Sequence, residues 1–399
     1  MSTSRAEYDL VLVVTTFRRV MVYLSLLKAM SAHHRIAVYV LPGSEHDEKK
    51  TGETNKLFLD RCRELGGDVV EGQALRARIA LIPQWPYTPA QRDALRRDVD
   101  AEENHVLIGV ATGMFHMEHL DGVPVHRLLV VDLDLFRFRL ENRPSEAALL
   151  RDGNAVVEVG LPFTRHPVMD DLGIDYLLAN PTPLSLPTLR ARVSYLRAVR
   201  RLLARLPPSD RVALKPHNAG ETHDYIVVPR ALALVRGRAI RPLRPILRRL
   251  LGLALALPDR AQARGLARQA LELLVALEYH ALLERVTPLR DLTPYHNFSL
   301  EVLLPQVRKG VITGRSNTLW HALYCRLPVY NCVDEEGLPE ETDKMNFLTM
   351  RYLGVPYCDG ELRCDPALFA RVRDEVRQRD LVAFYETRLS SPVASGTHG

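Results

Sequence analysis

The chain has 399 residues, of which 47% are hydrophobic and 25% charged, the balance of an ordinary globular protein with room for two α/β domains. Its formal net charge of +5 is a mild excess, so we expect no nucleic-acid partner. Five cysteines without CxxC spacing indicate a reducing compartment and argue against a structural zinc site.

The N-terminal residues contain charges and lead straight into an apolar strand, which is unlike a signal peptide. No apolar stretch approaches the roughly 18–20 residues that a membrane span requires. From these two features we expect a cytoplasmic protein.

The first 165 residues alternate short apolar runs with helical patterns. This alternation predicts a parallel, doubly wound sheet, which binds ligands at the carboxyl ends of its strands. The runs that read as buried strands are 9–17, 35–43, 77–85, 105–113 and 127–136, and the helices between them are 18–32, 52–65 and 88–100. A last strand with a Gly/Pro exit at 154–168 ends this first domain, predicted over 1–165.

The second α/β domain is predicted over 166–389, followed by a disordered tail at 390–399. Its predicted helices are 188–206, 299–307, 319–326 and 365–389, and its predicted strands are 211–218, 310–314 and 327–332. An arginine-rich helical insertion is predicted at 230–286. Within 230–264 there are nine arginines and a single acid, Asp259. This segment forms either a solvated basic face or a contact with an anionic membrane, which would put the protein at the inner face of the cytoplasmic membrane.

The segment GVITGRSNTLW (310–320) carries the clearest binding signal. A buried strand ends at a glycine, passes through a polar turn and enters a helix. Hydroxyl, amide and backbone N–H groups at such a turn suit a phosphate, although serine and asparagine there also serve as ordinary helix N-caps. The candidate ligand-binding residues are Thr313, Gly314, Arg315, Ser316, Asn317 and Thr318.

A second polar cluster, Lys215-Pro216-His217-Asn218, follows the strand predicted at 211–218. Pro216 stiffens the turn, so Lys215 and His217 project from the carboxyl end of the strand. They could neutralise a phosphate or protonate it as it leaves, while the alternative for His217 is a structural role in a buried turn. Two strand-end clusters in one domain are expected to converge on one site.

Together, KPHN and the later VITGRSNTLWHALYCRLPV resemble GT-B glycosyltransferases that use cytidine-linked donors. The families concerned are bacterial sialyltransferases, the Kdo transferases of capsule and lipopolysaccharide synthesis, and CDP-glycerol glycerophosphotransferases. Their KxHP motif and later Ser-Ser or Ser-Thr turn hold the phosphate and ribose of the donor, which implies these roles for Lys215, His217 and Ser316. Asn218 stands in place of the usual Pro, and Asn317 in place of the second Ser. The resemblance implies two Rossmann-like domains facing a central cleft, with no obligatory metal.

The catalytic base is expected in the first domain. The resembling sialyltransferases carry an acidic Asp/Glu-Asp-Gly motif there, and the nearest matches are Asp132 and Asp134, with Asp121 a looser one. A carboxylate at a strand end could deprotonate an acceptor hydroxyl. The resembling glycerophosphotransferases use a histidine instead, for which His116 is the candidate. Alternatively, Asp132-Leu133-Asp134 is the DxD motif of metal-dependent GT-A enzymes, which would bind Mg²⁺ or Mn²⁺.

The leading hypothesis is a glycosyltransferase that moves a Kdo-like or sialic-type ulosonic acid from a CMP-activated donor to a growing surface glycan or lipid-linked acceptor. The first alternative is a CDP-glycerol-type polyol phosphotransferase. The second is a degenerate GT-B protein that only binds nucleotide or glycan, in keeping with the two asparagine departures.

Overall fold

The computed structural model describes residues 6–15, 20–43, 52–84, 87–110, 122–142, 155–181, 185–216, 226–258, 264–336, 338 and 345–390. The chain divides into two compact units. Unit 1 comprises Met1–Asp170, Phe298–Pro305 and Val372–Gly399, and unit 2 comprises Asp171–Asn297 and Gln306–Arg371. The chain thus returns to unit 1 for two segments that lie inside the second domain predicted over 166–389.

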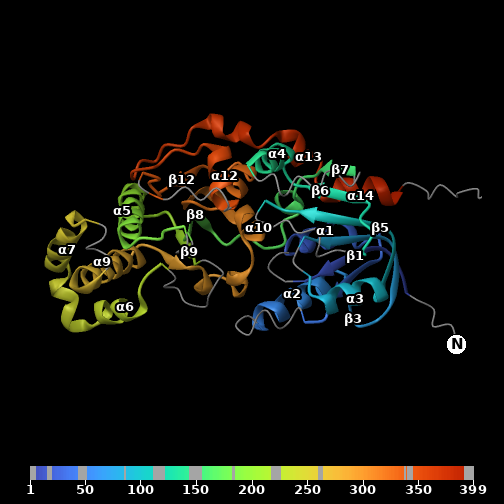
Figure 1. The fold of residues 1–399 in the computed structure, drawn as a ribbon, viewed down its shortest axis with the longest axis horizontal. Helices are drawn as coiled ribbons and strands as arrows, with labels where there is room; N and C mark the ends of the chain where they lie inside the picture. Colours follow the sequence, from blue (N-terminus) through green and yellow to red (C-terminus); the bar gives the residue numbers. More distant parts are fainter. Residues whose placement is uncertain are drawn as a thin grey trace, which may run out of the picture. The chain divides into compact units, whose positions relative to one another are not determined.

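Unit 1 is built on a seven-stranded sheet in which every neighbouring pair is parallel (Figure 1). The strand order is β3-β2-β1-β4-β5-β6-β7. The strands are β1 (Ala6–Val14), β2 (Ile36–Val40), β3 (Asp68–Glu71), β4 (Leu75–Pro83), β5 (Val99–Ile108), β6 (Arg127–Val130) and β7 (Ala155–Glu158). All five residues of β2 are buried, as expected of a parallel strand covered on both faces.

The helices of unit 1 follow the predicted rhythm in its first half. They are α1 (Val22–Met30), α2 (Gly52–Glu64), α3 (Pro89–Asp98), α4 (Leu133–Asn142), α10 (Leu300–Leu303), α13 (Asp374–Gln378) and α14 (Leu381–Ser390), with the 3₁₀ turn η5 (Pro162–Thr164). The strand predicted at 127–136 is wrong in its second half. The Asp132 carboxylate accepts a hydrogen bond from the Leu135 N–H at 2.9 Å, which caps α4 and ends the extended run.

The single helix predicted at 365–389 is also wrong. The chain forms η11 (Pro366–Arg371), then α13, then α14. Asp380 separates the last two, because its backbone bridges to Gly160 and its carboxylate caps α14 through the Ala383 N–H at 3.0 Å. The same carboxylate is buried and pairs with Arg165 at 3.3 Å.

A buried polar chain attaches α14 to β5. The Nε2 of His105 contacts the Glu103 carboxylate at 2.8 Å, its Nδ1 lies 3.3 Å from the Tyr385 hydroxyl, and Arg388 binds Glu103 at 2.6 Å. Burial lowers the pKa of His105 to about 4, although Glu103 acts in the opposite direction. Burial favours a raised pKa for Glu103, but hydrogen bonds from His105 and Arg388 outweigh it and lower the pKa to about 2. At neutral pH the imidazole is therefore neutral and donates to an ionised carboxylate.

We expect the free energy of unfolding to fall between pH 6.5 and pH 4. In that pH range His105 is protonated in the unfolded chain but stays neutral in the folded chain, so acid favours unfolding. The free energy of unfolding should fall by roughly 1–3 kcal/mol across the range. Urea denaturation of the parent and of His105→Gln across this range measures the effect, and the variant should show a flatter slope. His33→Gln, at an exposed histidine of the same unit, should keep the parental slope. Equal slopes for the parent and His105→Gln would contradict the assignment.

Unit 2 is built on a five-stranded parallel sheet of order β10-β9-β8-β11-β12. The strands are β8 (Ile174–Ala179), β9 (Val212–Lys215), β10 (Thr287–Pro288), β11 (Val307–Thr313) and β12 (Val329–Asn331). Together with unit 1, this sheet confirms the prediction of two α/β units with parallel, doubly wound sheets.

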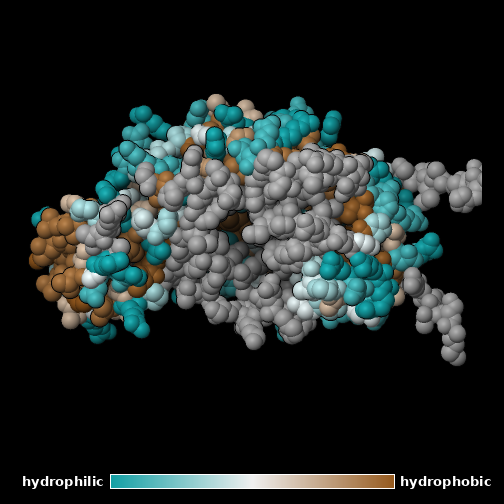
Figure 2. Space-filling model, viewed as in Figure 1, coloured by the Kyte–Doolittle hydropathy of each residue, from teal (hydrophilic) through white to brown (hydrophobic). Residues whose placement is uncertain are grey.

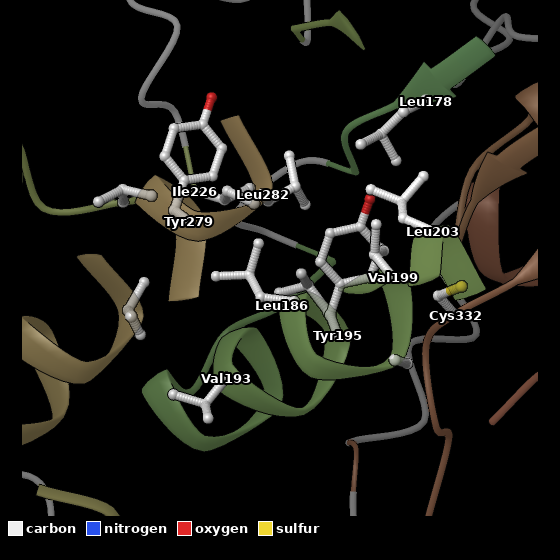
Figure 3. Packing of buried hydrophobic residues seen from close by; sticks show 14 of the residues in the cluster. Leu178, Leu186, Val193, Tyr195, Val199, Leu203, Ile226, Tyr279, Leu282 and Cys332 are labelled. Atoms are coloured by element: carbon white, nitrogen blue, oxygen red, sulfur yellow. The ribbon is translucent and has the colours of Figure 1, made fainter. Parts of the chain in front are cut away.

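The core of unit 2 lies between its sheet and the helices α5 and α9. Its helices are α5 (Leu189–Arg205), α6 (Pro229–Arg236), α7 (Arg244–Gly252), α9 (Gly265–Leu283), α11 (Thr318–Tyr324) and α12 (Met345–Leu353). Figure 3 shows Leu178 of β8 with Tyr195 and Val199 of α5 and Tyr279 and Leu282 of α9 in this cluster. All five side chains are at most 1% exposed. The described parts of the insertion predicted at 230–286, residues 230–258 and 264–286, are largely helical, and the last helix, α9, forms part of the core.

Candidate functional site

The strand order of unit 2 marks the position where an open α/β sheet binds its ligand. From β8 the chain builds β9 and β10 on one side, and then starts again with β11 on the other side of β8. Ligands bind beyond the carboxyl ends of the strands at such a switch point. In unit 2 this position follows Ala179 of β8 and Thr313 of β11.

The strand register places residues of both predicted motifs at the carboxyl end of this sheet, which we call the polar edge. Lys215 of β9 pairs with Ala179 of β8, and Thr313 of β11 pairs with Asn331 of β12. Since Ile312 pairs with Leu178, all four residues lie in one row across four adjacent strands. Lys215 and Thr313, about 100 positions apart in sequence, therefore lie in one row at the carboxyl end of the sheet, with Ala179 of β8 between them; their convergence on one ligand stays a prediction.

The turn after β11 has a backbone that few residues could adopt. A Cβ atom on Gly314 would lie 2.2 Å from Val333 Cγ2 and 3.0 Å from Asn331 Oδ1, so only glycine fits. Arg315 has a φ of 42°, in the left-handed region that is unfavourable for a side-chain-bearing residue. Strained backbone of this kind is concentrated at functional sites.

Arg315, directly after Gly314, is buried and makes three contacts with the rest of unit 2. Its side chain is 2% exposed, its Nε lies 3.3 Å from a Glu335 carboxylate oxygen, and its guanidinium lies 5.3 Å from the centre of the Phe347 ring. The Ser185 hydroxyl also donates to the Arg315 carbonyl at 3.2 Å. Burial raises the pKa of Glu335, although Arg315 acts in the opposite direction. The ion pair with Glu335, the Phe347 ring and the Ser185 hydroxyl together hold the turn in place.

Ser316 begins α11. Its hydroxyl accepts the Thr318 N–H at 3.2 Å and lies 2.8 Å from the Thr318 hydroxyl. Asn317 occupies the N-cap position but makes no side-chain capping bond. Capping is thus a real role of Ser316, and a ligand role for it stays a prediction.

Lys215 and Asn180 complete the polar edge. Lys215 is 3% exposed and its Nζ donates to the His296 carbonyl at 3.1 Å. Asn180, directly after β8, accepts from the Tyr195 hydroxyl at 3.5 Å. His217 and Asn218 lie outside the described residues.

Three buried polar atoms of uncharged side chains at this edge have no hydrogen-bond partner among the residues described. They are Asn180 Nδ2, Thr313 Oγ1 and Asn317 Oδ1. An unsatisfied buried polar atom costs about 1–3 kcal/mol, and such costs call for an explanation such as a bound ligand. Asn180 was not predicted as a site residue because β8 was not predicted as a strand. The signal in the sequence was the position of Asn180 directly after an apolar run and before Pro181.

The predicted carboxylates of unit 1 both have structural partners. Asp132 caps α4, as described above, and Asp134 pairs with Arg373 at 3.4 Å. Arg373 also binds Glu158, whose carboxylate accepts the Leu133 N–H at 2.8 Å. Asp132 and Asp134 therefore lie together after β6, while His116 and Asp121 lie outside the described residues.

Unit 1 has a switch point of its own, which the sequence analysis did not single out. Its chain moves from β1 to β2 and β3, and returns to β4 on the other side of β1. Thr15 follows β1 and Gln84 follows β4, and both are buried. The Thr15 hydroxyl has no partner among the described residues. The carboxyl ends of β1 and β4, with Thr15 and Gln84, are therefore a second candidate binding position in unit 1, besides the Asp132–Asp134 segment after β6.

The metal-dependent alternative for Asp132 and Asp134 can be tested by chelation. In the described ranges no group of three or more His, Cys, Asp or Glu residues could hold a metal ion. Asp132 and Asp134 also have protein partners, which would compete with a cation. We predict that donor turnover survives EDTA. Loss of turnover on chelation, restored by Mn²⁺, would instead assign Asp132 and Asp134 as metal ligands.

Comparison with known proteins gives no family model that matches the chain. No curated protein matches it either. Among solved structures, the chain is similar to CalG4, the calicheamicin glycosyltransferase, with a TM-score of 0.40 and 13% identity over 98% of this chain and 100% of that one. It is similar to the sucrose-phosphate synthase of Thermosynechococcus elongatus, with a TM-score of 0.38 and 11% identity over 96% and 97% of the two chains. It is also similar to S. aureus MnaA in complex with UDP, with a TM-score of 0.39 and 11% identity over 96% and 95%.

Proposed function

We propose that the chain is a GT-B glycosyltransferase whose unit 2 binds a nucleotide-activated sugar, with a CMP-linked ulosonic acid as the favoured donor. The observation that supports this most is the polar edge at the switch point of unit 2, where Lys215, Asn180 and the Thr313–Thr318 turn meet. The resemblance of KPHN and SNT to cytidine-donor enzymes supports the choice of CMP.

Four residues of the polar edge, together with His217, have a role in this proposal. Lys215 and His217 neutralise the donor phosphate, and the departing CMP takes a proton from His217. Ser316 and Thr318 donate hydroxyl hydrogen bonds to phosphate or ribose. Asn180 supplies its unpaired amide N–H to the nucleotide. Because Lys215, Ser316 and Asn180 are held by hydrogen bonds before any ligand binds, they stabilise the charge on the leaving group without reorganising.

The acceptor in this proposal is a glycan or glycolipid bound by unit 1. Asp132 or Asp134 removes the proton from the acceptor hydroxyl as it attacks the anomeric carbon of the donor. The sugar moves to the acceptor oxygen, and the glycosidic electron pair leaves with CMP. No metal takes part in this scheme.

A thermal-shift screen with CMP, CDP, UDP, GDP and dTDP tests the donor class. A ligand that binds only the folded chain raises Tm by linkage, so we expect the cytidine nucleotides to give the largest shift. A larger shift with another base would replace CMP in the proposal. Release of CMP together with a polyol phosphate would favour the phosphotransferase, and binding without turnover would favour the degenerate protein.

Ser316→Ala should weaken CMP binding by roughly 10- to 150-fold, because it removes a hydrogen bond to a charged group worth about 1.5–3 kcal/mol. Titration calorimetry measures the change. The substitution also removes the bond to the Thr318 N–H, so the matched control is Thr188→Ala, which removes the same kind of bond to Ala191 at the start of α5. We expect Thr188→Ala to bind CMP like the parent. Parental binding by Ser316→Ala would remove Ser316 from the site.

A further inference from the structure

The surface of unit 2 carries a concentrated apolar patch. Every large apolar side chain of the described residues that is at least 40% exposed lies between positions 234 and 266. These side chains are Leu234, Leu243, Ile246, Leu250, Leu253, Leu257 and Leu266. In Figure 2 the patch is the brown area at the left, where Figure 1 places α6, α7 and α9. Patches of this kind mark interaction sites.

Five of these residues form a stripe on α7 and its flanking turns, η6 (Arg238–Leu243) and η7 (Leu253–Ala256). Leu243, Ile246, Leu250, Leu253 and Leu257 follow one another at spacings of three and four, the period of one helix face. We name these five residues the leucine stripe. Their exposed fractions range from 40% for Leu257 to 71% for Leu253, so no element in the described part of the chain covers the face.

The opposite face of α7 fixes the leucine stripe in an outward orientation. Leu247 and Leu251 pack against the core of unit 2. Arg244 is buried and donates from Nε and from one terminal nitrogen to the Val235 carbonyl, at 3.2 and 2.8 Å. Arg248 donates to the Leu277 carbonyl at 3.0 Å. These contacts hold the inner face of α7 against unit 2. The helix therefore cannot rotate about its axis to bury the leucine stripe.

The charge around the leucine stripe has one sign. Residues 226–258 contain seven arginines and no acid. Arg238, Arg241 and Arg249 are exposed, and none of them pairs with any described residue. Arg249 lies three positions after Ile246 and four before Leu253, so it adjoins the leucine stripe on the helix surface.

We propose that the leucine stripe and these three arginines bind the surface of an anionic lipid bilayer. An amphipathic helix of this kind lies in the plane of the membrane interface, with leucines in the acyl boundary and arginines at anionic headgroups. A second copy of the chain fits less well, because a two-fold contact on the stripe would bring unpaired arginines of both copies together. No described helix is both long and apolar enough to cross a membrane, so the contact is with one face of the bilayer.

Vesicle flotation tests the proposal. The parent should float with vesicles of phosphatidylcholine mixed with phosphatidylglycerol, and stay unbound with phosphatidylcholine alone. Added salt should weaken binding because it screens the arginines. Leu250→Glu with Leu253→Glu should abolish flotation, and Arg241→Glu and Arg249→Glu should each weaken it roughly fivefold or more. Arg371→Glu makes the same charge change at an exposed arginine outside the patch, and should float like the parent.

A spectroscopic measurement locates the contact. Leu253→Trp keeps the stripe apolar, and its emission should shift to the blue on adding the anionic vesicles. Leu362→Trp, at a leucine 37% exposed and outside the patch, should show no shift. Circular dichroism of each variant verifies that it is folded. Absence of parental flotation, equal flotation of the Leu250/Leu253 variant, or a parental dimer that this variant converts to a monomer would each overturn the proposal.

Discussion

Asp132→Asn is expected to lower kcat for sugar transfer by roughly 10²- to 10⁴-fold while CMP binding stays at the parental level. The proposed reaction needs a carboxylate to take the acceptor proton, and an amide at the same position cannot take it. Because the proposed donor site lies in unit 2, donor affinity should not depend on this residue of unit 1. The expected result is therefore a loss in kcat without a change in nucleotide affinity.

Asn is a more informative substitution at Asp132 than Ala, because it separates the loss of the charge from the loss of the helix cap. Asp132 caps α4 through the Leu135 N–H, and asparagine is as good an N-cap as aspartate. Asp132→Asn thus removes the charge and keeps the cap, whereas Asp132→Ala removes both. If Asp132→Asn keeps the parental kcat and only Asp132→Ala loses stability, the residue is a helix cap and nothing more.

Asp134→Asn tests the second candidate carboxylate. Asp134 pairs with Arg373, which retains Glu158 as a partner, so the local structure should survive the change. If both asparagine variants keep near-parental kcat, His116 and then Asp121 become the candidates for the base.

The apolar strands of unit 1 were predictable because helices cover both faces of a parallel sheet, which leaves continuous apolar runs in the sequence. β3 has no such run, since it is a partly exposed edge strand of four residues, and it was missed. The end of β6 was missed for a different reason. Residues 127–136 are almost continuously apolar, and the change from strand to helix is signalled only by the capping Asp132.

β8 was not predicted from the sequence. This error had the largest consequence, because β8 is the central strand of unit 2. Its sequence IDYLLA carries Asp175 and Tyr176 within the strand, and the Asp175 carboxylate accepts the Arg211 N–H at 2.9 Å. A polar side chain paired with the neighbouring strand interrupts the apolar pattern on which the strand predictions rest. Without β8, the switch point and Asn180 could not be found from the sequence.

The two polar motifs could be located from the sequence because each lies directly after a strand, while their role in binding a donor stays a prediction. Gly314 helps to mark the second motif, since its place beside Val333 admits no side chain. The partners of the site could not be predicted in the same way. Glu335 and Phe347 contact Arg315 only because folding brings these distant positions together. No local sequence pattern predicts such contacts.

Glu278→Ala is expected to have the largest effect on stability. The Glu278 side chain is 3% exposed and pairs with three arginines: Arg197 at 3.2 Å, Arg200, and Arg248 at 4.0 Å. Arg197 and Arg200 belong to α5 and Arg248 to α7, so one carboxylate of α9 joins three helices. Removing one partner of a buried ion pair leaves the remaining charges uncompensated, at a cost of about 3–5 kcal/mol.

The cost should lie near 3 kcal/mol, at the lower end of this range. The side chains of Arg197 and Arg200 are 36% exposed, so water can partly solvate the charges that Glu278 leaves behind. Urea denaturation measures the loss. Glu272→Ala is the matched control on the same helix, because its pair with Arg268 is a surface pair at 2.9 Å with Arg268 61% exposed, and its loss should cost about 0.5 kcal/mol or less. Since Arg248 anchors α7, Glu278→Ala should also weaken vesicle binding if the leucine stripe depends on a fixed helix. Equal stability of the two variants would show that the three arginines do not depend on Glu278.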